Sequence, residues 1–578
     1  MGKLHLAATE FLAHGYIFHP KFGGDDYCFS KSFSKASGIY NIKFEITEDS
    51  FNRPPFPIVE SLPEQLRSRR LPHLLLGKYC CLFSDTSIID PININQLVAS
   101  WLYKVEEVVD LWDSGDYSED YVAEFGVYWG GIPTYLLESA DLNKNLEVYS
   151  FERRALNGNS STEYIVASER KIAEKWAQSR NAVGVTEYRN SAVFVKLTQA
   201  PYIHYDHPWP PKSLKDFSNW LLMSSNEPVV LEKLLVALAK LGKWSKGWNT
   251  FVDVIFHYDN EFFGVSFNLP TESRKAIVNH YGPKSRRGRG KQARERLRKR
   301  IFDNSREKIF PLDVMPCSPD YVIERNRAIS SPILSNKRIA LIGAGTIGGY
   351  LAHSLCQVGA GHDAGYFFIY DNDTLKVGNL GRHILGAKFI GERKSDSLKY
   401  HIEEQGLDLE VQAEGKFHLS SDLSRFDLIL DATGDQAFAL NLSSKVAEYR
   451  SQGGKVLLIH SWISGFGHTV KSMLDDGVNG CYACQFDYSK GAVKTELYPS
   501  FANGKEPDVD NIFKRSCGEN HLPFGSEASM LAASLAVQLL RRRNKKTPSL
   551  LMRRVSDQAI ELKDKKLKKN PDCPSCRS

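Results

Sequence analysis

The residues best suited to chemistry surround three short apolar runs in the C-terminal half of the chain. The first run, RIALIGAGTIGG, contains Gly343, Gly345 and Gly348 at the spacing G-x-G-x-x-G, after an expected strand and before an expected helix. Glycines at this spacing permit a tight turn and let backbone N–H groups approach a phosphate at the positive end of a helix. The motif predicts a nucleotide site without deciding which nucleotide binds.

The charged residues that follow favour ATP over a dinucleotide. Asp371 comes directly after the second run, FFIY, where a carboxylate is suited to ribose hydroxyls. Further along lie a second acid, an amide, two cations and a third acid that follows the run DLIL: Asp373, Asn379, Arg382, Lys394 and Asp435. Cations and a carboxylate able to hold Mg²⁺ are what charge build-up at phosphorus requires, whereas hydride transfer has no use for them.

These motifs, taken in order, resemble the ThiF/MoeB superfamily, which includes the ubiquitin-activating enzymes. The segments concerned are G-A-G-T-I-G-G, D-N-D, N-L-G-R-H, G-E-R-K and D-A-T-G-D. The resemblance implies adenylation of a protein's C-terminal carboxylate, with release of pyrophosphate. It implies that Asp371 holds the ribose and that Asp435 holds Mg²⁺. Arg382 and Lys394 would neutralise the triphosphate.

The segment RNRAI, upstream of the glycine motif, is similar to the arginine entry segment of the same superfamily. The resemblance implies that Arg327 reaches the phosphates bound by the other subunit, and therefore that the protein is a homodimer. Arg325 is an equally good candidate for this role.

A cysteine near the C-terminal end has the surroundings of a nucleophile. Cys517 follows Lys514 and Arg515 and precedes a glycine-marked helix start. Nearby cations favour the thiolate, which is the form that attacks an activated carbonyl. The catalytic cysteine of the superfamily stands before a similar stretch, so the resemblance implies that Cys517 takes the acyl group from AMP as a thioester. The alternative is a buried structural cysteine.

Two C-x-x-C pairs predict a structural metal site. They are Cys481 with Cys484 and Cys573 with Cys576. Four thiolates make the closed tetrahedral set that holds structural Zn²⁺. A redox C-x-x-C is the alternative, but neither pair opens a helix after a strand. The ThiF/MoeB superfamily carries two such pairs at similar places, and zinc would fasten the C-terminal tail.

The N-terminal region contains a second candidate thiol in LPHLLLGKYCCLF. The alternating run IYNIKFEIT, the Pro-rich FNRPPFP, this segment and the helix after IIDPININQ resemble a prokaryotic ubiquitin-conjugating domain. The resemblance implies that Cys80 accepts the thioester, with Cys81 as the alternative. The eukaryotic His-Pro-Asn signature is absent, and His73 is expected to be a packed residue at the end of a strand.

A conjugating domain followed by an adenylating domain resembles the fused ligases of bacterial CBASS anti-phage operons. That family joins the C-terminus of a cGAS/DncV-like nucleotidyltransferase to another molecule. A related bacterial pathway conjugates a ubiquitin-like protein instead. A sulfur-carrier adenylyltransferase of the MoeB kind is a further alternative, although it leaves the N-terminal region unexplained. A nucleotide-gated scaffold without turnover is disfavoured by the retained acids and cations.

The elements that must position these groups indicate an α/β chain with three domains. Residues 1–130 are expected to form an α+β ubiquitin-conjugating-like domain, and residues 131–320 a mixed α/β linker domain without a chemical motif. Residues 321–578 are expected to form a Rossmann-like ThiF adenylation domain, because apolar strands that end in glycine or aspartate alternate there with helical stretches.

Composition sets the remaining expectations. A net charge of +6 over 578 residues is too small to name nucleic acid as a partner. The basic run KSRRGRGKQARERLRKR is expected to be a solvated loop and helix. No apolar run of membrane-spanning length and no secretory signal pattern is present, so we expect a cytoplasmic protein. Ten cysteines in that compartment are more compatible with thiols and metal ligands than with disulfides.

Overall fold

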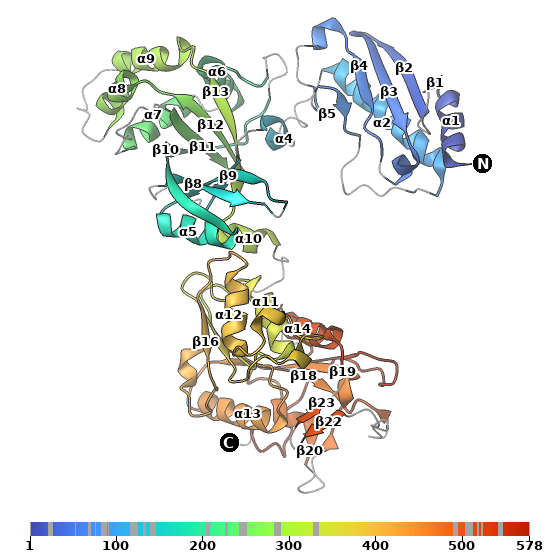
Figure 1. Cartoon of the computed structure of the whole chain (residues 1–578), viewed down its shortest axis with the longest axis vertical. Coiled ribbons are helices and arrows are strands. Elements are labelled where there is room, and N and C mark those ends of the chain that lie inside the picture. Colours follow the sequence, from blue (N-terminus) through green and yellow to red (C-terminus); the bar gives the residue numbers. More distant parts are fainter. Residues whose placement is uncertain are drawn as a thin grey trace. The chain divides into compact units, whose positions relative to one another are not determined.

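A computed structural model describes most of the chain (Figure 1). The chain forms two compact units, Met1–Ala173 with Gly184–Pro316, and Glu174–Val183 with Cys317–Ser578. The described residues are 2–20, 27–52, 54–67, 71–75, 77–82, 90, 92–115, 125–130, 134–138, 146–155, 157–203, 209–225, 229–241, 251–259, 261–282, 291–326, 334–488, 495–502, 513–516, 519–521, 524–541 and 547–576.

The first unit begins with an antiparallel sheet whose strands follow the order β1-β2-β3-β4-β6-β5. Its elements are α1 (Lys3–Ala13), β1 (Ile17–Pro20), β2 (Tyr27–Lys35), β3 (Gly38–Ile46), η1 (Glu48–Phe51), β4 (Ile58–Ser61), η2 (Glu64–Leu66), β5 (Leu74–Leu75), β6 (Tyr79–Cys80) and α2 (Ile94–Ser114). The inward side chains of β3 alternate with outward ones, as expected for a strand that is buried on one face.

Helix α2 explains why the segment after the cysteine pair folds back on the sheet. Asn93 caps its start by accepting the Gln96 backbone N–H at 3.2 Å, and Gly115 ends it in the left-handed conformation. Most of its apolar residues recur at helical spacing and are buried. The Trp112 indole donates to the Pro72 carbonyl at 2.8 Å, which ties the helix to the chain just before β5.

The first unit also contains a closed barrel, in the strand order β10-β11-β12-β13-β7-β9-β8. Its strands are β7 (Thr134–Leu137), β8 (Glu147–Arg154), β9 (Ser160–Ala167), β10 (Ala182–Lys196), β11 (Phe251–Tyr258), β12 (Glu261–Asn268) and β13 (Ile309–Pro316). The helices of this region are α4 (Phe125–Trp129), α6 (Leu214–Ser224), α7 (Val230–Lys240), α8 (Thr271–Tyr281), α9 (Lys291–Arg298) and η3 (Lys299–Asp303). Helix α5 (Arg170–Ser179) begins in the first unit, but its residues from Glu174 onward belong to the second.

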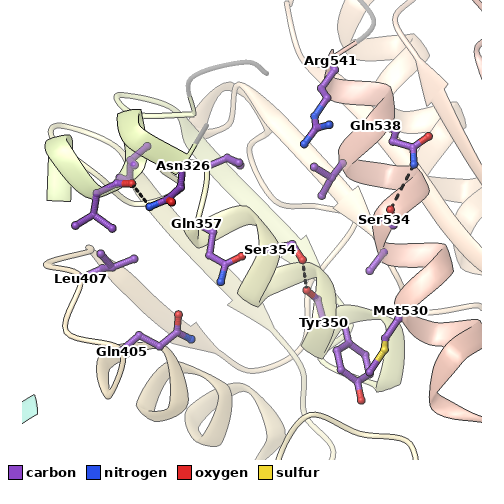
Figure 2. A pocket seen from close by; sticks show the side chains of 15 residues that line it. Asn326, Tyr350, Ser354, Gln357, Gln405, Leu407, Met530, Ser534, Gln538 and Arg541 are labelled. Atoms are coloured by element: carbon purple, nitrogen blue, oxygen red, sulfur yellow. Dashed lines mark hydrogen bonds between the residues drawn. The ribbon is translucent and has the colours of Figure 1, made fainter. Parts of the chain in front are cut away.

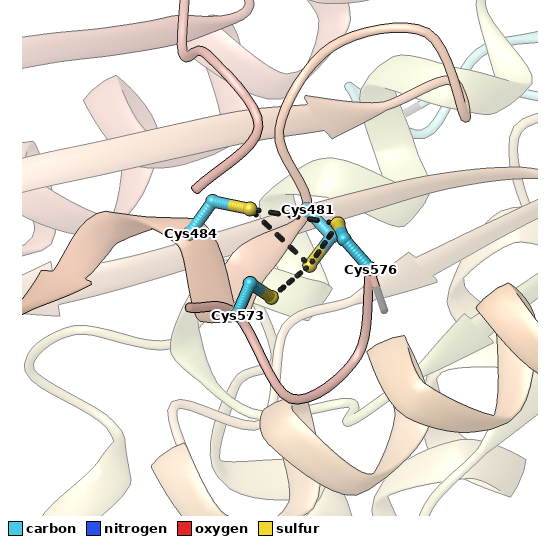
Figure 3. Close-up of side chains that lie close together, drawn as sticks. All are labelled: Cys481, Cys484, Cys573 and Cys576. Carbon is cyan, nitrogen blue, oxygen red and sulfur yellow. Dashed lines mark hydrogen bonds between the residues drawn. The ribbon is translucent and has the colours of Figure 1, made fainter. Parts of the chain in front are cut away.

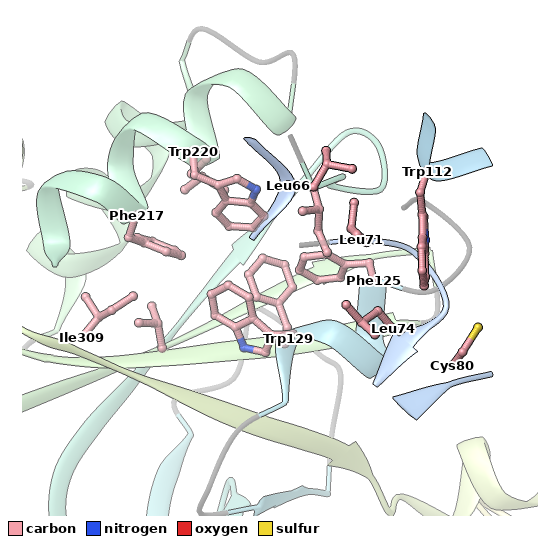
Figure 4. Packing of buried hydrophobic residues seen from close by; sticks show 14 of the residues in the cluster. Leu66, Leu71, Leu74, Cys80, Trp112, Phe125, Trp129, Phe217, Trp220 and Ile309 are labelled. Atoms are coloured by element: carbon pink, nitrogen blue, oxygen red, sulfur yellow. The ribbon is translucent and has the colours of Figure 1, made fainter. Parts of the chain in front are cut away.

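Two apolar clusters hold the first unit together. One fills the barrel and includes Tyr135, whose hydroxyl donates to the buried Asp253 at 2.8 Å. The other, shown in part in Figure 4, contains aromatic side chains such as Trp112, Trp129 and Trp220. Cys80 is a member of this second cluster. The boundaries predicted at residues 130 and 320 stay a prediction.

The second unit is built on a seven-stranded sheet in the order β16-β15-β14-β17-β18-β19-β24. The first five strands are parallel, and β19 and β24 are antiparallel to their neighbours. The elements are α10 (Pro319–Asn326), β14 (Arg338–Ile342), α11 (Thr346–Cys356), β15 (Tyr366–Tyr370), α12 (Lys394–Glu403), β16 (Val411–Glu414), β17 (Leu428–Asp431), α13 (Gln436–Ser451), β18 (Leu457–Ser464), β19 (Thr469–Asp475), α14 (Ser526–Arg541) and β24 (Leu550–Arg554).

Helices cover both faces of this sheet (Figure 1). Ile339 and Leu341 of β14 pack with α11, α12 and α14, whereas Ala340 and Ile342 pack with α13 on the opposite face. Burial on both faces explains why β14 is a continuous apolar run and does not alternate. The Rossmann-like architecture predicted for this region is confirmed.

Short elements complete the second unit. They are η4 (Val377–Asn379), η5 (Ala387–Phe389), η6 (Leu423–Arg425), η7 (Gly465–Gly467), η8 (Tyr482–Gln485), β20 (Phe486–Asp487), β21 (Thr495–Glu496), β22 (Phe513–Ser516) and β23 (Glu519–His521). Among the residues described above, no helix combines the length and the apolar character that a membrane crossing requires.

Candidate active site

The strand order of the seven-stranded sheet places the glycine turn where the order reverses. The chain runs from β14 outward to β15 and β16 and then returns to β17 on the other side of β14. In register, Ile342 at the end of β14 lies between Tyr370 of β15 and Asp431 of β17. Ligands of open α/β sheets bind outside the carboxyl ends of strands at such a reversal of order.

The glycines of the turn are required by close backbone contacts. Gly343 has φ +93°, and a Cβ there would lie 3.0 Å from the backbone of Ala432 and Thr433. A Cβ at Gly348 would lie 1.9 Å from the Gly343 carbonyl oxygen. Gly345 caps the start of α11, whose first N–H groups have no partner within the helix and suit an anion. The turn therefore has a backbone that could approach a phosphate closely.

Asp371 fixes two turns with one carboxylate. It follows β15 directly, and its Oδ2 accepts the Ala344 backbone N–H at 2.7 Å. Its Oδ1 accepts the Asp373 backbone N–H, also at 2.7 Å. Each carboxylate oxygen has a further lone pair with which it can accept a hydroxyl proton. Asp371 thus holds the glycine turn and remains able to bind a ribose.

Lys394 and Asp373 form an ion pair next to this turn. Lys394 Nζ lies 3.1 Å from Asp373 Oδ2, and the Lys394 backbone N–H donates to the Asp373 carbonyl at 2.8 Å. The Lys394 side chain is only 12% exposed, whereas that of Asp373 is 78% exposed. Because Asp373 is so exposed, a phosphate can compete with it for the lysine.

Arg382 lies against an aromatic ring. Its guanidinium carbon is 4.3 Å from the centre of the Phe524 ring. Burial lowers the pKa of Arg382, but a guanidinium remains charged at any physiological pH. The Asn379 side-chain oxygen accepts the Lys376 backbone N–H at 2.9 Å, so Asn379 stabilises its own turn.

His383 is a residue of the site that the sequence analysis did not single out. Its Nδ1 accepts the Leu385 backbone N–H at 3.1 Å, so the ring proton lies on Nε2, which donates to the Ala344 carbonyl at 2.9 Å. Burial lowers the pKa of His383, which favours this neutral form. Asp371 and His383 therefore hold the N–H and the carbonyl of the same residue. The sequence signal that could have identified His383 is its position directly after Arg382.

The loop between β17 and α13, residues 432–435, carries the third acid, Asp435. We call this segment the acidic loop. Asp435 caps α13, with Oδ1 accepting the Phe438 backbone N–H at 3.0 Å. The Asp435 backbone N–H donates to the Thr433 hydroxyl oxygen at 3.2 Å, and that hydroxyl donates to Asp431 at 2.7 Å. A capping carboxylate uses one of its two oxygens, so Asp435 retains a ligand for a divalent cation.

The structure brings most of the predicted nucleotide-site residues to one edge of the sheet. Asp371 bonds to the glycine turn, and the turn packs on Ala432 and Thr433 of the acidic loop. This edge comprises Gly343, Gly345, Gly348, Asp371, Asp373, Lys394 and Asp435. The arrangement can bind a phosphate chain, a ribose and a divalent cation together.

The four cysteines of the two C-x-x-C pairs form one cluster (Figure 3). Sγ–Sγ distances are 3.8 Å for Cys481–Cys484, 3.6 Å for Cys481–Cys573, 3.5 Å for Cys484–Cys576 and 3.4 Å for Cys481–Cys576. Tetrahedral Zn–S bonds of about 2.3 Å place the sulfur atoms about 3.8 Å apart. The donor set and its spacing therefore fit Zn²⁺.

The adjacent cysteines of the first unit differ in exposure. Cys80 ends β6, pairs with Leu74 of β5 and is only 2% exposed. Burial raises the pKa of its thiol. Cys81 is half-buried, and its backbone N–H donates to the His73 carbonyl at 2.8 Å. His73 adopts φ +60°, which is uncommon for a residue other than glycine.

Two predicted catalytic residues, Cys517 and Arg327, lie outside the described residues. Strands β22 and β23 flank Cys517 in sequence and pair with each other, with Ser516 opposite Glu519. Arg325, the alternative to Arg327, lies at the end of α10 and donates to the Tyr321 hydroxyl at 3.1 Å.

A cavity of about 630 Å³ lies elsewhere in the second unit (Figure 2). It is lined by α10, by Tyr350 and Ser354 of α11, by Gln357 directly after that helix, and by α14. None of the predicted nucleotide-binding residues lines it. It is therefore distinct from the group of residues at the glycine turn.

Comparison with known proteins shows what the chain is similar to. Residues 331–577 match the model of the ThiF family. The chain is 26% identical to the ATP-dependent ubiquitin transferase-like protein Cap2 of Escherichia coli (strain TW11681), over 95% of this chain and 93% of that protein. It is 28% identical to the protein of the same name from Vibrio cholerae serotype O1 (strain ATCC 39315 / El Tor Inaba N16961), over 88% and 86%.

Among solved structures, the crystal structure of E. coli MccB with ATP aligns with 42% of this chain and 67% of its own. The identity is 18% and the TM-score is 0.29.

The C-terminal region is therefore a ThiF-family domain. The whole chain is a ThiF-containing fusion related to the ubiquitin transferase-like proteins along most of its length. The resemblance inferred from the sequence is confirmed.

Proposed function

We propose that the chain uses ATP to activate the C-terminal carboxylate of a protein and then conjugates that protein to an amine. The observation that carries this proposal is the sheet edge where the glycine turn, Asp371, Lys394 and Asp435 meet. The relatives, named ATP-dependent ubiquitin transferase-like proteins, align over nearly the full chain and support the same activity.

The first step is adenylation. A carboxylate oxygen of the target attacks the α-phosphorus of ATP, the bond to the bridging oxygen of the β-phosphate breaks, and pyrophosphate leaves. The glycine turn holds the phosphates and Asp371 holds the ribose. Lys394 and Arg382 neutralise charge that builds up on the departing pyrophosphate, which is the main contribution expected of a preorganised site.

The second stage is a thiol relay. The Cys517 thiolate attacks the acyl carbonyl, the bond to the AMP oxygen breaks, and AMP leaves. A second thiol, on Cys81 or Cys80, then displaces Cys517 by attack on the thioester. An acceptor amine finally attacks that thioester, which forms an amide and releases the thiol. The greater exposure of Cys81 favours it over Cys80.

Two metals fit the donor atoms. The carboxylate of Asp435 would hold Mg²⁺, which would supply positive charge to screen the phosphates. The Cys₄ cluster suits a structural Zn²⁺ that fastens the C-terminal tail to the ThiF domain.

The partners are proposed from the resemblance to CBASS ligases. The activated protein is a cGAS/DncV-like nucleotidyltransferase, and a ubiquitin-like protein is the alternative. Arg327 completes the site of the other subunit of a homodimer. Residues 1–130, 131–320 and 321–578 act as conjugating, linker and adenylating domains in the cytoplasm. An adenylyltransferase of the MoeB kind has no use for the N-terminal thiols.

Pyrophosphate exchange tests the proposed activity. The full chain should catalyse exchange of labelled pyrophosphate into ATP only when a target with a free C-terminal carboxylate is present, and should release AMP and not ADP. Lys394→Ala should reduce the exchange rate by about 10- to 100-fold, because it removes a cation from the transition state. The matched control is Lys399→Ala, five residues along the same helix, where the lysine is half-buried and pairs with Glu403. Release of ADP, or exchange with an amidated C-terminus, would contradict the proposal.

Zinc loss should lower stability. We expect about one zinc per chain by elemental analysis. Cys573→Ser should remove it and lower the Tm by at least about 6 °C, since loss of about 3 kcal/mol shifts the Tm of a domain of this size by that amount. Cys317→Ser, which alters a cysteine outside the cluster, should keep the zinc. Full zinc occupancy in Cys573→Ser would exclude the Cys₄ site.

A further inference from the structure

A buried polar network lies directly beneath the acidic loop. His460 of β18 pairs in register with Asp431 of β17, and its Nδ1 lies 2.8 Å from Asp431 Oδ2. Its Nε2 lies 3.1 Å from the Ser443 hydroxyl on α13. His460 is 1% exposed, and its two partners are also buried. Buried polar groups that are fully paired restrict a structure to one arrangement.

The protons of this network can be assigned from its donors and acceptors. The Asp431 carboxylate can only accept, so His460 Nδ1 carries a proton and donates it. In the neutral ring, Nε2 then accepts from the Ser443 hydroxyl. The sequence of serine, histidine and aspartate is that of a hydrolase triad, but Ser443 has no exposed surface and cannot meet a substrate.

The two partners of His460 stand on either side of the loop. Asp431 precedes the loop and accepts hydrogen bonds from the Thr433 backbone N–H at 3.0 Å and from its hydroxyl at 2.7 Å. Thr433 in turn accepts the Asp435 backbone N–H. Ser443 lies on α13, the helix that Asp435 caps. One imidazole is therefore connected to both ends of the segment that carries Asp435.

The ring is itself held by packing. The Tyr482 ring centre lies 4.7 Å from that of His460, and Trp462 packs edge-on against Tyr482 at 5.2 Å. Tyr482 directly follows Cys481, so the residue that packs on His460 belongs to the same segment as the Cys₄ cluster.

We propose that His460 is a positioning residue that fixes the Asp431–Asp435 loop from both ends and so sets the affinity of the site for Mg²⁺. This inference rests on the proposed adenylation. Residues that orient a metal ligand without touching the metal typically change metal affinity by about 10- to 100-fold when they are replaced.

The test measures Mg²⁺ dependence in the full chain. His460→Phe keeps the ring volume and removes both hydrogen bonds, and it should raise the Mg²⁺ concentration for half-maximal pyrophosphate exchange by about 10- to 100-fold. His460→Asn keeps an N–H donor for Asp431 and should return this value to within about threefold of the wild type. Calorimetry with α,β-methylene-ATP gives a second readout: His460→Phe should lose the gain in affinity that Mg²⁺ provides over EDTA.

The matched control is His362→Phe. His362 is also buried and lies 2.7 Å from an aspartate, but that partner, Asp320, belongs to α10 and not to the loop that carries Asp435. It should leave the Mg²⁺ dependence within about twofold of the wild type. If His460→Phe does not fold, Ser443→Ala replaces it, with an expected shift of about 3- to 10-fold.

Three outcomes would overturn the proposal, provided that the wild type still catalyses exchange. They are an unchanged Mg²⁺ dependence in His460→Phe, the same shift in His362→Phe, and no recovery in His460→Asn. Absence of both exchange and Mg²⁺-dependent binding in the wild type would instead refute the proposed function.

Discussion

Asp371→Ala is expected to lower kcat/KM for ATP in pyrophosphate exchange by at least about 100-fold. The carboxylate accepts two backbone N–H groups, from Ala344 and Asp373, at 2.7 Å each. Hydrogen bonds to a charged group contribute about 1.5–3 kcal/mol each, and 1.4 kcal/mol is a factor of ten. The substitution releases the glycine turn and also removes the proposed ribose acceptor. Both the affinity for ATP and the positioning of its phosphates should therefore decrease. Titration of exchange rate against ATP measures the effect.

Asp422→Ala is the matched control for this prediction. Asp422 also accepts two local hydrogen bonds, from the Ser424 backbone N–H at 2.9 Å and from its hydroxyl at 2.7 Å. It is exposed and caps η6, before β17 begins. Its loss should change kcat/KM by less than about twofold. An equal fall in both variants would mean that Asp371 acts through general stability and not through the nucleotide.

The sequence was sufficient to predict the sheet edge because its information is local. Each of its features can be recognised from a few consecutive residues. These features are a glycine with φ +93°, an aspartate directly after a strand, and apolar runs that are buried on both faces. The fixed order of a parallel sheet then brings those strand ends together, so Asp371 and Gly343 become neighbours although 28 residues separate them in the sequence.

The rest could not be predicted because it depends on contacts between distant segments. His460 stands in LLIHSWIS, which reads only as an apolar strand, and its role depends on Asp431 and Ser443 from two other elements. The barrel could not be predicted from a sequence motif either, because β10 pairs in parallel with β11 across a long insertion. No short motif records such pairings.

The cysteine pair shows the same limit on a smaller scale. The sequence preferred Cys80 over Cys81 from family spacing alone. The register of β5 and β6 places Cys80 in the apolar cluster of the first unit and leaves Cys81 half-buried one residue further on. The thiolate is the attacking form, and burial raises the pKa of Cys80. The less buried neighbour, Cys81, should therefore carry the acyl group.

Substitution of single thiols should separate the steps of the relay. With a fluorescent target, Cys81→Ala should retain the thioester on Cys517 but abolish transfer to an amine. Cys80→Ala should retain both thioesters and lose only about 1 kcal/mol of stability, as expected for a small buried truncation. Cys517→Ala should form neither thioester and still exchange pyrophosphate, because adenylation does not need that thiol.

Non-reducing gels, with peptide mapping of the labelled cysteine, provide the measurement. The two adjacent cysteines control for each other, since they share a strand end and differ mainly in exposure. If Cys80→Ala blocks transfer and Cys81→Ala does not, the short pairing of β6 with β5 must open during the reaction to release the buried thiol. If Cys517→Ala still loads either N-terminal cysteine, the acyl group passes directly from AMP and the relay has a single thiol.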